Sequence, residues 1–298
     1  MYGAPHPDLA EVGAGARQFS PLVPGAEALE AAADGALARM VIAAPPGVLE
    51  RRYVLAQALR VLEPGGELIA MASKTRGGAR LRAELESFGC DVAERGARHQ
   101  RLCVAARPGT PTDLEAAITQ GGPQLASALE LWSQPGIFSW DRLDPGSALL
   151  IEHLGHLAGR GADLGCGIGL LSLRILASPA VTALAAIDLD RRAVAAAARN
   201  LAGDARAQVS QHDLRQPPPD LAGLNFVIMN PPFHDGGLED RNLGQAFIQR
   251  ASALLRKGGV LRMVANIGMP YEAVLAEAFA RVKPLRQAQG YKLFEAVR

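Results

Sequence analysis

The sequence has few cysteines, almost no net charge and no long apolar run, and each absence excludes a class of protein. The three cysteines, at positions 90, 103 and 166, have neither paired nor metal-ligand spacing, which argues against a disulfide framework or a zinc site. No uninterrupted apolar run approaches the length of a membrane span, and the N-terminus lacks a basic stretch followed by an apolar core. We therefore expect a soluble cytoplasmic protein with no membrane partner and no bound metal.

Overall charge gives no case for a polyanionic partner, because 298 residues carry a net charge of only +1. One stretch, residues 74–107, has eight Lys or Arg against four acidic residues, a local balance of +4. Such a run is commonly a solvated helix face. If it contacts RNA instead, we expect Arg76, Arg80 and Arg82 to bind phosphate.

The most informative motif is Asn230-Pro231-Pro232-Phe233, which follows the apolar run 226–229. The lone pair of a planar NH2 group is delocalised, and acceptors that draw its hydrogens aside make the nitrogen nucleophilic. Asn230 offers a side-chain carbonyl and Pro231 a backbone carbonyl, and neither proline has an N–H that would compete. Phe233 offers a flat face to a substrate ring, with Pro232 beside it. The same residues are also typical of an ordinary strand-ending turn.

A glycine-rich loop lies upstream, at 163–169 (Asp-Leu-Gly-Cys-Gly-Ile-Gly). Its glycines allow a tight turn after a strand and close approach of the backbone to a ligand. Asp188 ends the next expected strand, 25 residues after Asp163, where a carboxylate can bind ribose hydroxyls. A third strand leads to Asp213, and a fourth ends in Asn230. This order predicts a nucleoside site at the ends of successive strands.

The expected ligand is S-adenosylmethionine rather than a dinucleotide, because the chain has an amine-activating loop and no Walker-type Gly-Lys-Ser/Thr. The candidate donor-binding residues are Phe138 at the methionine end, Asp163 near the amino-acid moiety, Gly165, Cys166, Gly167 and Gly169 in the loop, Asp188 on the ribose, Asp213 near the adenine amino group, and Asn230. For Phe138 core packing is an alternative, and for Asp213 the alternative is capping of a turn.

Residues 136–298 resemble the class I methyltransferase domain of the bacterial ribosomal RNA guanine-N2 methyltransferases. The similar segments are 136–139, 143–147, the glycine loop, 230–236, 264–266, 270–271 and 290–294. The last three resemble the small-subunit (16S) members more than the large-subunit members. The resemblance implies methyl transfer from S-adenosylmethionine to the exocyclic N2 of a guanine in ribosomal RNA or the small ribosomal subunit. The products are the methylated base and S-adenosylhomocysteine, and no DNA partner is expected. Asn230, Pro231 and Phe233 would be catalytic, and Pro232, Phe233 and His234 would contact the guanine.

Several alternatives remain open at this point. Asn-Pro-Pro-aromatic is shared with adenine-N6 and glutamine-N5 methyltransferases, although the His234-Asp235-Gly236 extension and a two-domain layout favour guanine. A large-subunit guanine and a non-catalytic role in ribosome assembly are further alternatives. His234 is a candidate base or a residue that holds the loop or touches RNA. The target nucleotide, the assembly state of the substrate and the oligomeric state are not predicted.

An internal repeat predicts two α/β halves, because residues 41–46 echo 227–232 and a Gly-Gly pair follows each copy. Ala44 stands in place of Asn230 in the echo, so the first copy is expected to be non-catalytic. We predict an α/β protein with two Rossmann-like class I methyltransferase domains: a truncated, degenerate one at 1–110, a linker at 111–135, and a catalytic one at 136–298. By the resemblance, the catalytic domain has a mostly parallel seven-stranded sheet. Its helices are expected near 147–158, 168–177, 191–201, 243–256 and 271–280, and 287–297 as an antiparallel edge strand.

Overall fold

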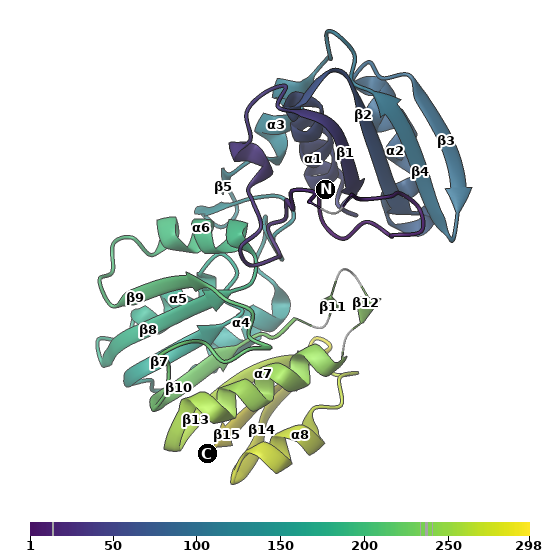
Figure 1. The fold of residues 1–298 in the computed structure, drawn as a ribbon. Helices are drawn as coiled ribbons and strands as arrows, with labels where there is room; N and C mark the ends of the chain where they lie inside the picture. Colours follow the sequence, from purple (N-terminus) through teal and green to yellow (C-terminus); the bar gives the residue numbers. More distant parts are fainter. Residues whose placement is uncertain (14, 233, 236–237, 240) are drawn as a thin grey trace. The chain divides into compact units, whose positions relative to one another are not determined.

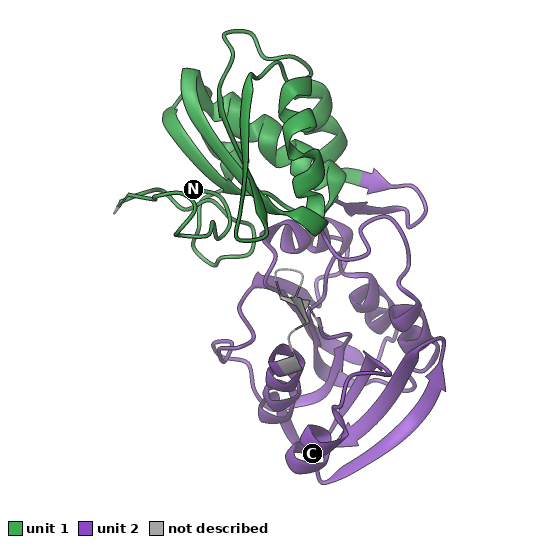
Figure 2. Ribbon diagram, turned by 90° about the vertical axis from the view of Figure 1, so that its right-hand side faces the viewer, with its two compact units in different colours: residues 1–124, 134–136 green, residues 125–133, 137–298 purple. Residues whose placement is uncertain are grey.

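The computed structural model describes residues 1–298 except 14, 233, 236–237 and 240, and for 233–241 it describes no side chains. The chain forms two compact units, coloured separately in Figure 2. Unit 1 comprises residues 1–124 and 134–136, and unit 2 comprises 125–133 and 137–298. The segment expected to be a linker is divided between them, since α3 (Leu114–Gly121) belongs to unit 1 and β6 (Leu131–Ser133) to unit 2.

Unit 2 is built on a seven-stranded sheet of order β14-β15-β13-β10-β7-β8-β9. The strands from β13 to β9 are parallel, whereas β15 and β14 are antiparallel. The strands are β7 (Gly159–Leu164), β8 (Val181–Asp188), β9 (Ala207–Gln211), β10 (Leu224–Met229), β13 (Leu255–Asn266), β14 (Arg281–Ala288) and β15 (Tyr291–Val297). The helices are α4 (Pro145–Glu152), α5 (Leu170–Leu176), α6 (Arg191–Asn200), α7 (Arg241–Leu254) and α8 (Glu272–Ala278). The predicted mostly parallel sheet is confirmed.

Helices cover both faces of this sheet (Figure 1). Ile248 of α7 and Leu275 of α8 belong to the core on one face. Leu150 of α4 and Ile175 of α5 belong to the core on the other. Residues 226–229 contribute alternately to the two cores, because successive side chains of a strand point to opposite faces. Burial on both faces explains why this segment is an uninterrupted apolar run.

The C-terminal strand differs from the prediction in one respect. β15 is antiparallel as expected, but it pairs with β13 on one side and with β14 on the other, so β14 is the edge strand. The sequence of β14 concealed it, because this strand includes Pro284 and its residues are exposed or only half-buried. An edge strand tolerates proline, since one side of its backbone has no partner in the sheet. The helix expected at 147–158 also ends early, at Glu152.

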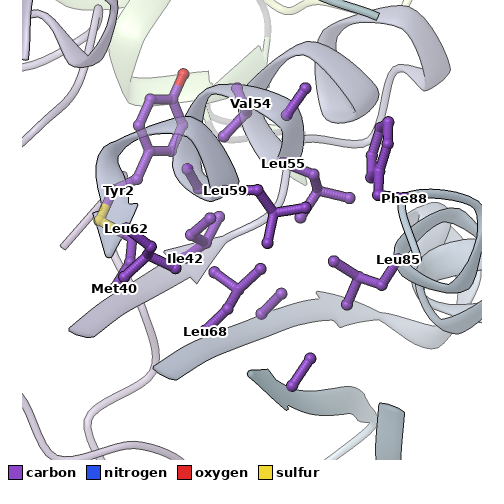
Figure 3. Packing of buried hydrophobic residues seen from close by; sticks show 14 of the residues in the cluster. Tyr2, Met40, Ile42, Val54, Leu55, Leu59, Leu62, Leu68, Leu85 and Phe88 are labelled. Carbon is purple, nitrogen blue, oxygen red and sulfur yellow. The ribbon is translucent and has the colours of Figure 1, made fainter. Parts of the chain in front are cut away.

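Unit 1 contains a four-stranded sheet of order β1-β2-β4-β3. Its elements are η1 (Leu29–Ala31), β1 (Leu37–Ala43), α1 (Val48–Val61), β2 (Leu62–Ser73), η2 (Lys74–Gly78), α2 (Ala79–Ser87), β3 (Val92–Ala97), β4 (Gln100–Ala106) and α3. Figure 3 shows Leu55 and Leu59 of α1 above Ile42 and Leu68 of the strands. Unit 1 therefore has a hydrophobic core of its own.

Unit 1 repeats the second half of the unit 2 sheet. The order β1-β2-β4-β3 corresponds to β10-β13-β15-β14, with the same parallel and antiparallel pairs. An irregularity in the β1–β2 register between Leu37 and Arg39 recurs in β10–β13 between Leu224 and Phe226. Among the described residues of unit 1, no strand corresponds to β7, β8 or β9. The described residues of unit 1 therefore contain no counterpart of the strands that precede the glycine loop and Asp188, and a truncated first domain stays a prediction.

The register corrects one detail of the repeat. Matching the two irregularities places Ala43 level with Asn230, whereas the sequence echo aligns Ala44 with it. This register makes Ile42 equivalent to Met229. The two residues also agree in burial, since Ile42 packs in the core with α1 and Met229 packs in the core with α7. Both candidate positions hold alanine, so the first copy has no side-chain amide there.

Three observations on the described residues concern membrane spans, cysteines and metal ligands. Within the described ranges, no helix is both long and apolar enough to cross a membrane. The three cysteines are free and buried. The described residues also contain no group of three His, Cys, Asp or Glu that could hold a metal ion.

Candidate active site

Several of the predicted site residues, Phe138, Gly165, Cys166, Gly167 and Asn230, line one pocket of unit 2. β10 and β8 are the two neighbours of β7, so the segments that follow these strands emerge at one edge of the sheet. The pocket opens there, lined by Phe138, Ser139, Arg142, Leu143, Asp144, Ser147, Gly165, Cys166, Gly167, Ile168, Leu170, Leu171 and Asn230. The glycine loop and the amide of Asn230 therefore face one pocket.

Asp163 lies in β7, just before the glycine loop, and is fully buried. Its Oδ2 accepts a hydrogen bond of 2.6 Å from the hydroxyl of Ser172, and its Oδ1 has no partner within the described part of the chain. Burial raises the pKa of this carboxyl to about 7. A buried acceptor without a partner, beside an open loop, fits a ligand that is cationic or carries N–H groups.

The glycine loop presents its backbone to the pocket. Gly165 and Gly167 line the pocket and have positive φ angles of 75° and 54°. A Cβ on Gly167 would meet no atom within 4 Å, whereas one on Gly169 would approach Ala197 to 3.3 Å. Gly169 therefore allows close packing of the loop on α6, and it is absent from the pocket lining. Cys166 is buried and lines the pocket.

Asp188, at the end of β8, holds the glycine loop. Its Oδ2 accepts a hydrogen bond of 2.8 Å from the backbone N–H of Gly167, and its Oδ1 accepts one of 2.9 Å from the N–H of Asp190. Burial raises its pKa to about 6. The carboxylate thus links β8 to the loop after β7, which is consistent with a nucleoside site across both strands.

Asn230 is held by Asp144 and Ser147, and Asp144 by Tyr291; none of the three was a predicted site residue. Its Nδ2 donates to Asp144 Oδ2 and to Ser147 Oγ, each at 2.9 Å. The hydroxyl of Tyr291 donates to Asp144 Oδ1 at 3.1 Å. Both hydrogens of the Asn230 amide are therefore engaged, and its carbonyl oxygen is the group left for a substrate.

A local signal for Asp144 exists in the sequence. Asp144 caps α4, where it accepts a hydrogen bond of 2.8 Å from the N–H of Ser147, with Pro145 in the first turn. Asp-Pro-x-Ser is typical of a helix start. The pattern predicts the cap, but it does not predict the contact with Asn230.

The remaining predicted residues have different positions. Phe138 is 61% exposed and lines the pocket, which excludes core packing for its ring. Asp213 follows β9 and does not line the pocket; it accepts a hydrogen bond of 3.0 Å from the N–H of Arg215. A side-chain hydrogen bond from Arg215 also lowers the pKa of Asp213. These contacts are those of a turn cap, so a role at adenine stays a prediction.

The loop after Asn230 is described only in part. Pro231 is buried and Pro232 is exposed. Phe233 lies outside the described residues. His234 begins β11 (His234–Asp235), which pairs with β12 (Leu238–Glu239), and its side chain lies outside the description. The predictions for Phe233 and His234 therefore stay predictions.

The sheet topology, the glycine loop after β7 and Asn-Pro-Pro after β10 together define a Rossmann-like class I methyltransferase. Residues 128–295 match the family described as methyltransferase small domain. The chain is 33% identical to ribosomal RNA small subunit methyltransferase C of Pseudomonas paraeruginosa (strain DSM 24068 / PA7), over 89% of this chain and 80% of that protein. The protein of the same name from Stutzerimonas stutzeri (strain A1501) is 35% identical, over 82% and 74%.

A solved structure is similar to the chain and has a related name. The T. thermophilus 16S rRNA N2 G1207 methyltransferase (RsmC), in complex with AdoMet and guanosine, matches with a TM-score of 0.76 and 28% identity. The match covers 91% of this chain and 75% of that one. The chain therefore belongs to the methyltransferase small domain family and, within it, to the family of the ribosomal RNA small subunit methyltransferases C.

Proposed function

We propose that this protein transfers a methyl group from S-adenosylmethionine to the exocyclic N2 of a guanine in 16S ribosomal RNA. The observation that carries the proposal is Asn230, whose amide hydrogens are both engaged while its oxygen is left to accept a hydrogen bond from a substrate amine. The family of the chain, and the guanosine and AdoMet in the similar solved structure, support this choice of substrate and donor.

The residues of the pocket fit the donor. We assign Phe138 to the methionine end, and Cys166 with the backbone of Gly165 and Gly167 to close contact with the donor. The buried Asp163 provides negative charge near the positively charged amino-acid end. Asp188 and Asp213, which follow the next two strands, are assigned to the ribose and the adenine amino group. The donor supplies a methyl group already activated by its sulfonium, so no metal is needed.

The chemical task of the protein is to prepare the guanine N2. In this proposal, Asn230 Oδ1 and the backbone carbonyl of Pro231 accept the two N2 hydrogens and localise the lone pair on nitrogen. The N2–CH3 bond then forms as the C–S bond breaks, and the electron pair of that bond stays on sulfur. The cationic N2 loses a proton to water. The protein contributes alignment and charge placement.

Presentation of the base is a separate requirement. A paired guanine has its N2 inside a helix groove, so the base must be extruded or already unpaired. Phe233 is proposed to stack on the extruded base, a contact that contributes about 1 to 3 kcal/mol. The proposed substrate particle is the small ribosomal subunit or its free RNA.

The test is transfer of labelled methyl from S-adenosylmethionine to unmodified small-subunit particles, large-subunit particles and protein-free RNA, followed by nucleoside mass spectrometry. We expect N2-methylguanosine in small-subunit material only, and its loss in Asn230→Ala. Asn225→Ala is the matched control, because Asn225 lies in β10, the strand that precedes Asn230, and its Oδ1 accepts from the backbone N–H of Arg160 at 3.0 Å instead. Label in adenine, in protein or in large-subunit RNA would favour one of the alternative activities.

A further inference from the structure

We propose that Asp144 is a positioning residue that sets the orientation of the Asn230 amide and increases the negative charge on its oxygen. This proposal rests on the function proposed above and concerns the same pocket. Asp144, the N-cap of α4, lies 86 residues before Asn230 in the chain, and its Oδ2 accepts a hydrogen bond from Asn230 Nδ2 at 2.9 Å.

The orientation argument starts from the symmetry of an amide. Rotation of the Asn230 side-chain amide by 180° exchanges its oxygen and its NH2, and only the oxygen can accept a hydrogen from a substrate amine. An ionised carboxylate has no hydrogen to donate, so the rotated amide would place its oxygen against Asp144 Oδ2 without a hydrogen between them. The contact with Ser147 Oγ, also at 2.9 Å, holds the second hydrogen. Asp144 therefore excludes the unproductive orientation.

Asp144 is itself fixed in place, which a positioning residue requires. It is only 7% exposed, and it accepts from the N–H of Ser147 at 2.8 Å and from the hydroxyl of Tyr291 at 3.1 Å. The neighbouring Gly146 leaves room for this arrangement, since a Cβ there would come within 2.6 Å of the Tyr291 ring. The helix cap and β15 thus hold the carboxylate from two sides.

The charge of Asp144 adds a second effect. Hydrogen bonds to an ionised acceptor are shorter and stronger than neutral ones, and they polarise the donor group. Polarisation of the Asn230 amide moves electron density onto its oxygen. In the proposed reaction this oxygen accepts a hydrogen of N2, the atom that becomes positive during methyl transfer. Preorganised charge of this kind stabilises a transition state more than the ground state. Both Asp144 oxygens accept hydrogen bonds from protein donors, and Oδ2 contacts the Asn230 amide, so in this proposal the carboxylate acts through Asn230.

The first test is Asp144→Asn, which keeps an oxygen for the donors and removes the charge. We expect kcat to fall by about tenfold or more, by analogy with the removal of one preorganised hydrogen bond in other active sites. The KM for RNA and the Kd for S-adenosylmethionine should stay within about threefold, because Asp144 stabilises the transition state. Asp204→Asn is the matched control: Asp204 pairs with Arg206 at 2.6 Å in the same unit, away from the pocket, and kcat should be retained.

An unchanged kcat in Asp144→Asn would overturn the proposal. A parallel loss of donor affinity and thermal stability would overturn it too, because it would show a purely structural role. Side-chain NMR separates this outcome from failure of the proposed function. With selectively 15N-labelled asparagine, the Asn230 NH2 signals, assigned by their loss in Asn230→Ala, should shift in Asp144→Asn and not in Asp204→Asn. Unshifted Asn230 signals would overturn the contact whatever the substrate proves to be.

Discussion

The hydroxyl of Ser172 donates a hydrogen bond of 2.6 Å to Asp163, a carboxylate with no exposed surface. Burial raises the pKa of Asp163 from 3.8 to about 7. Its charged form at neutral pH therefore lowers the stability of the folded protein. Groups that destabilise the fold in this way are common in functional sites, where a ligand compensates the charge.

Asp163→Asn is expected to stabilise the free protein and to weaken donor binding strongly. The folded-state pKa is raised, so the stability of the wild type falls as pH rises from 3.8 to about 7, and the full cost is present above that range. At 1.36 kcal/mol per pKa unit the gain is at most about 4 kcal/mol. Urea unfolding at pH 8 and titration calorimetry with the donor measure the two effects. Asp204→Asn should instead destabilise, since hydrogen bonds from Arg206 lower the Asp204 pKa to about 2.

Donor affinity should depend on pH through the same carboxylates. Burial raises the pKa of Asp163 to about 7 and that of Asp188 to about 6. A cationic donor binds the ionised forms, so protonation competes with binding as pH falls through these values. The Kd should rise by about tenfold per pH unit for each carboxylate that is protonated. Calorimetry between pH 5.5 and 8.5 measures the slope, and a Kd that is independent of pH would contradict the assignment of these residues.

A methyl group on Gly167 should block the donor more than it harms the fold. Gly167 has φ of 54° and open space at its Cβ position, and it lines the pocket. Gly167→Ala therefore incurs a backbone cost of about 1 to 2 kcal/mol and projects a methyl group toward the ligand. Gly223→Ala is the matched control, with φ of 70°, equally open space and no place in the pocket. We expect the two variants to lose similar stability, and only Gly167→Ala to bind the donor more weakly. Equal donor affinities of the two variants would contradict the proposed location of the donor.

Unit 1 depends on a buried ion pair. Arg51 has no exposed surface, its guanidinium contacts both oxygens of Glu84 at 2.6 and 2.7 Å, and it donates to the carbonyl of Pro46 at 2.8 Å. Glu84→Gln leaves this charge uncompensated and should cost about 3 to 5 kcal/mol. Glu86→Gln removes the partner of the exposed Arg82 and should cost less than about 1 kcal/mol. Urea unfolding compares the two, and equal losses would contradict a role for the buried pair.

The basic segment of unit 1 remains a candidate RNA-binding surface. Arg82 is paired with Glu86, whereas Arg80 is exposed. Reversing the charge of Arg76, Arg80 and Arg82 together should weaken RNA binding. The slope of log K against log salt concentration should become shallower by about 0.7 to 0.9 for each phosphate that is no longer neutralised. The matched control reverses the charge of the exposed residues Arg281, Lys283 and Arg286 of β14. Equal binding by the two triple variants, measured by filter binding at several salt concentrations, would refute a role for this segment in RNA binding.

Much of unit 2 could be predicted because its signals are local. The glycine loop, Asp188 and Asn230 each follow an apolar strand, and parallel strands bring such ends to one edge of a sheet. The edge strand β14 could not be predicted in this way, since Pro284 and exposed side chains hide its pattern. An edge strand is specified by pairing with β15, which the sequence of β14 alone does not show.

Contacts between distant residues explain what was missed in the site. Asp144 and Tyr291 were part of segments similar to the family, but their link to Asn230 spans 86 residues in one direction and 61 in the other. Asn230 itself could be predicted because an asparagine followed by two prolines is a pattern of neighbouring residues. Its orientation could not, because the amide is held by Asp144 and Ser147 at the start of α4, and Asp144 is held in turn by Tyr291 of β15.

By itself, the sequence determined the class of fold, the repeat and the residue types at the site, because strand patterns, glycine loops and proline motifs act over a few neighbouring residues. Only the tertiary structure decided that Ala43 is level with Asn230, that β14 is the edge, and that Asp144 holds the Asn230 amide. Strand register and side-chain orientation depend on packing and hydrogen bonds between segments far apart in the chain, which no local pattern encodes.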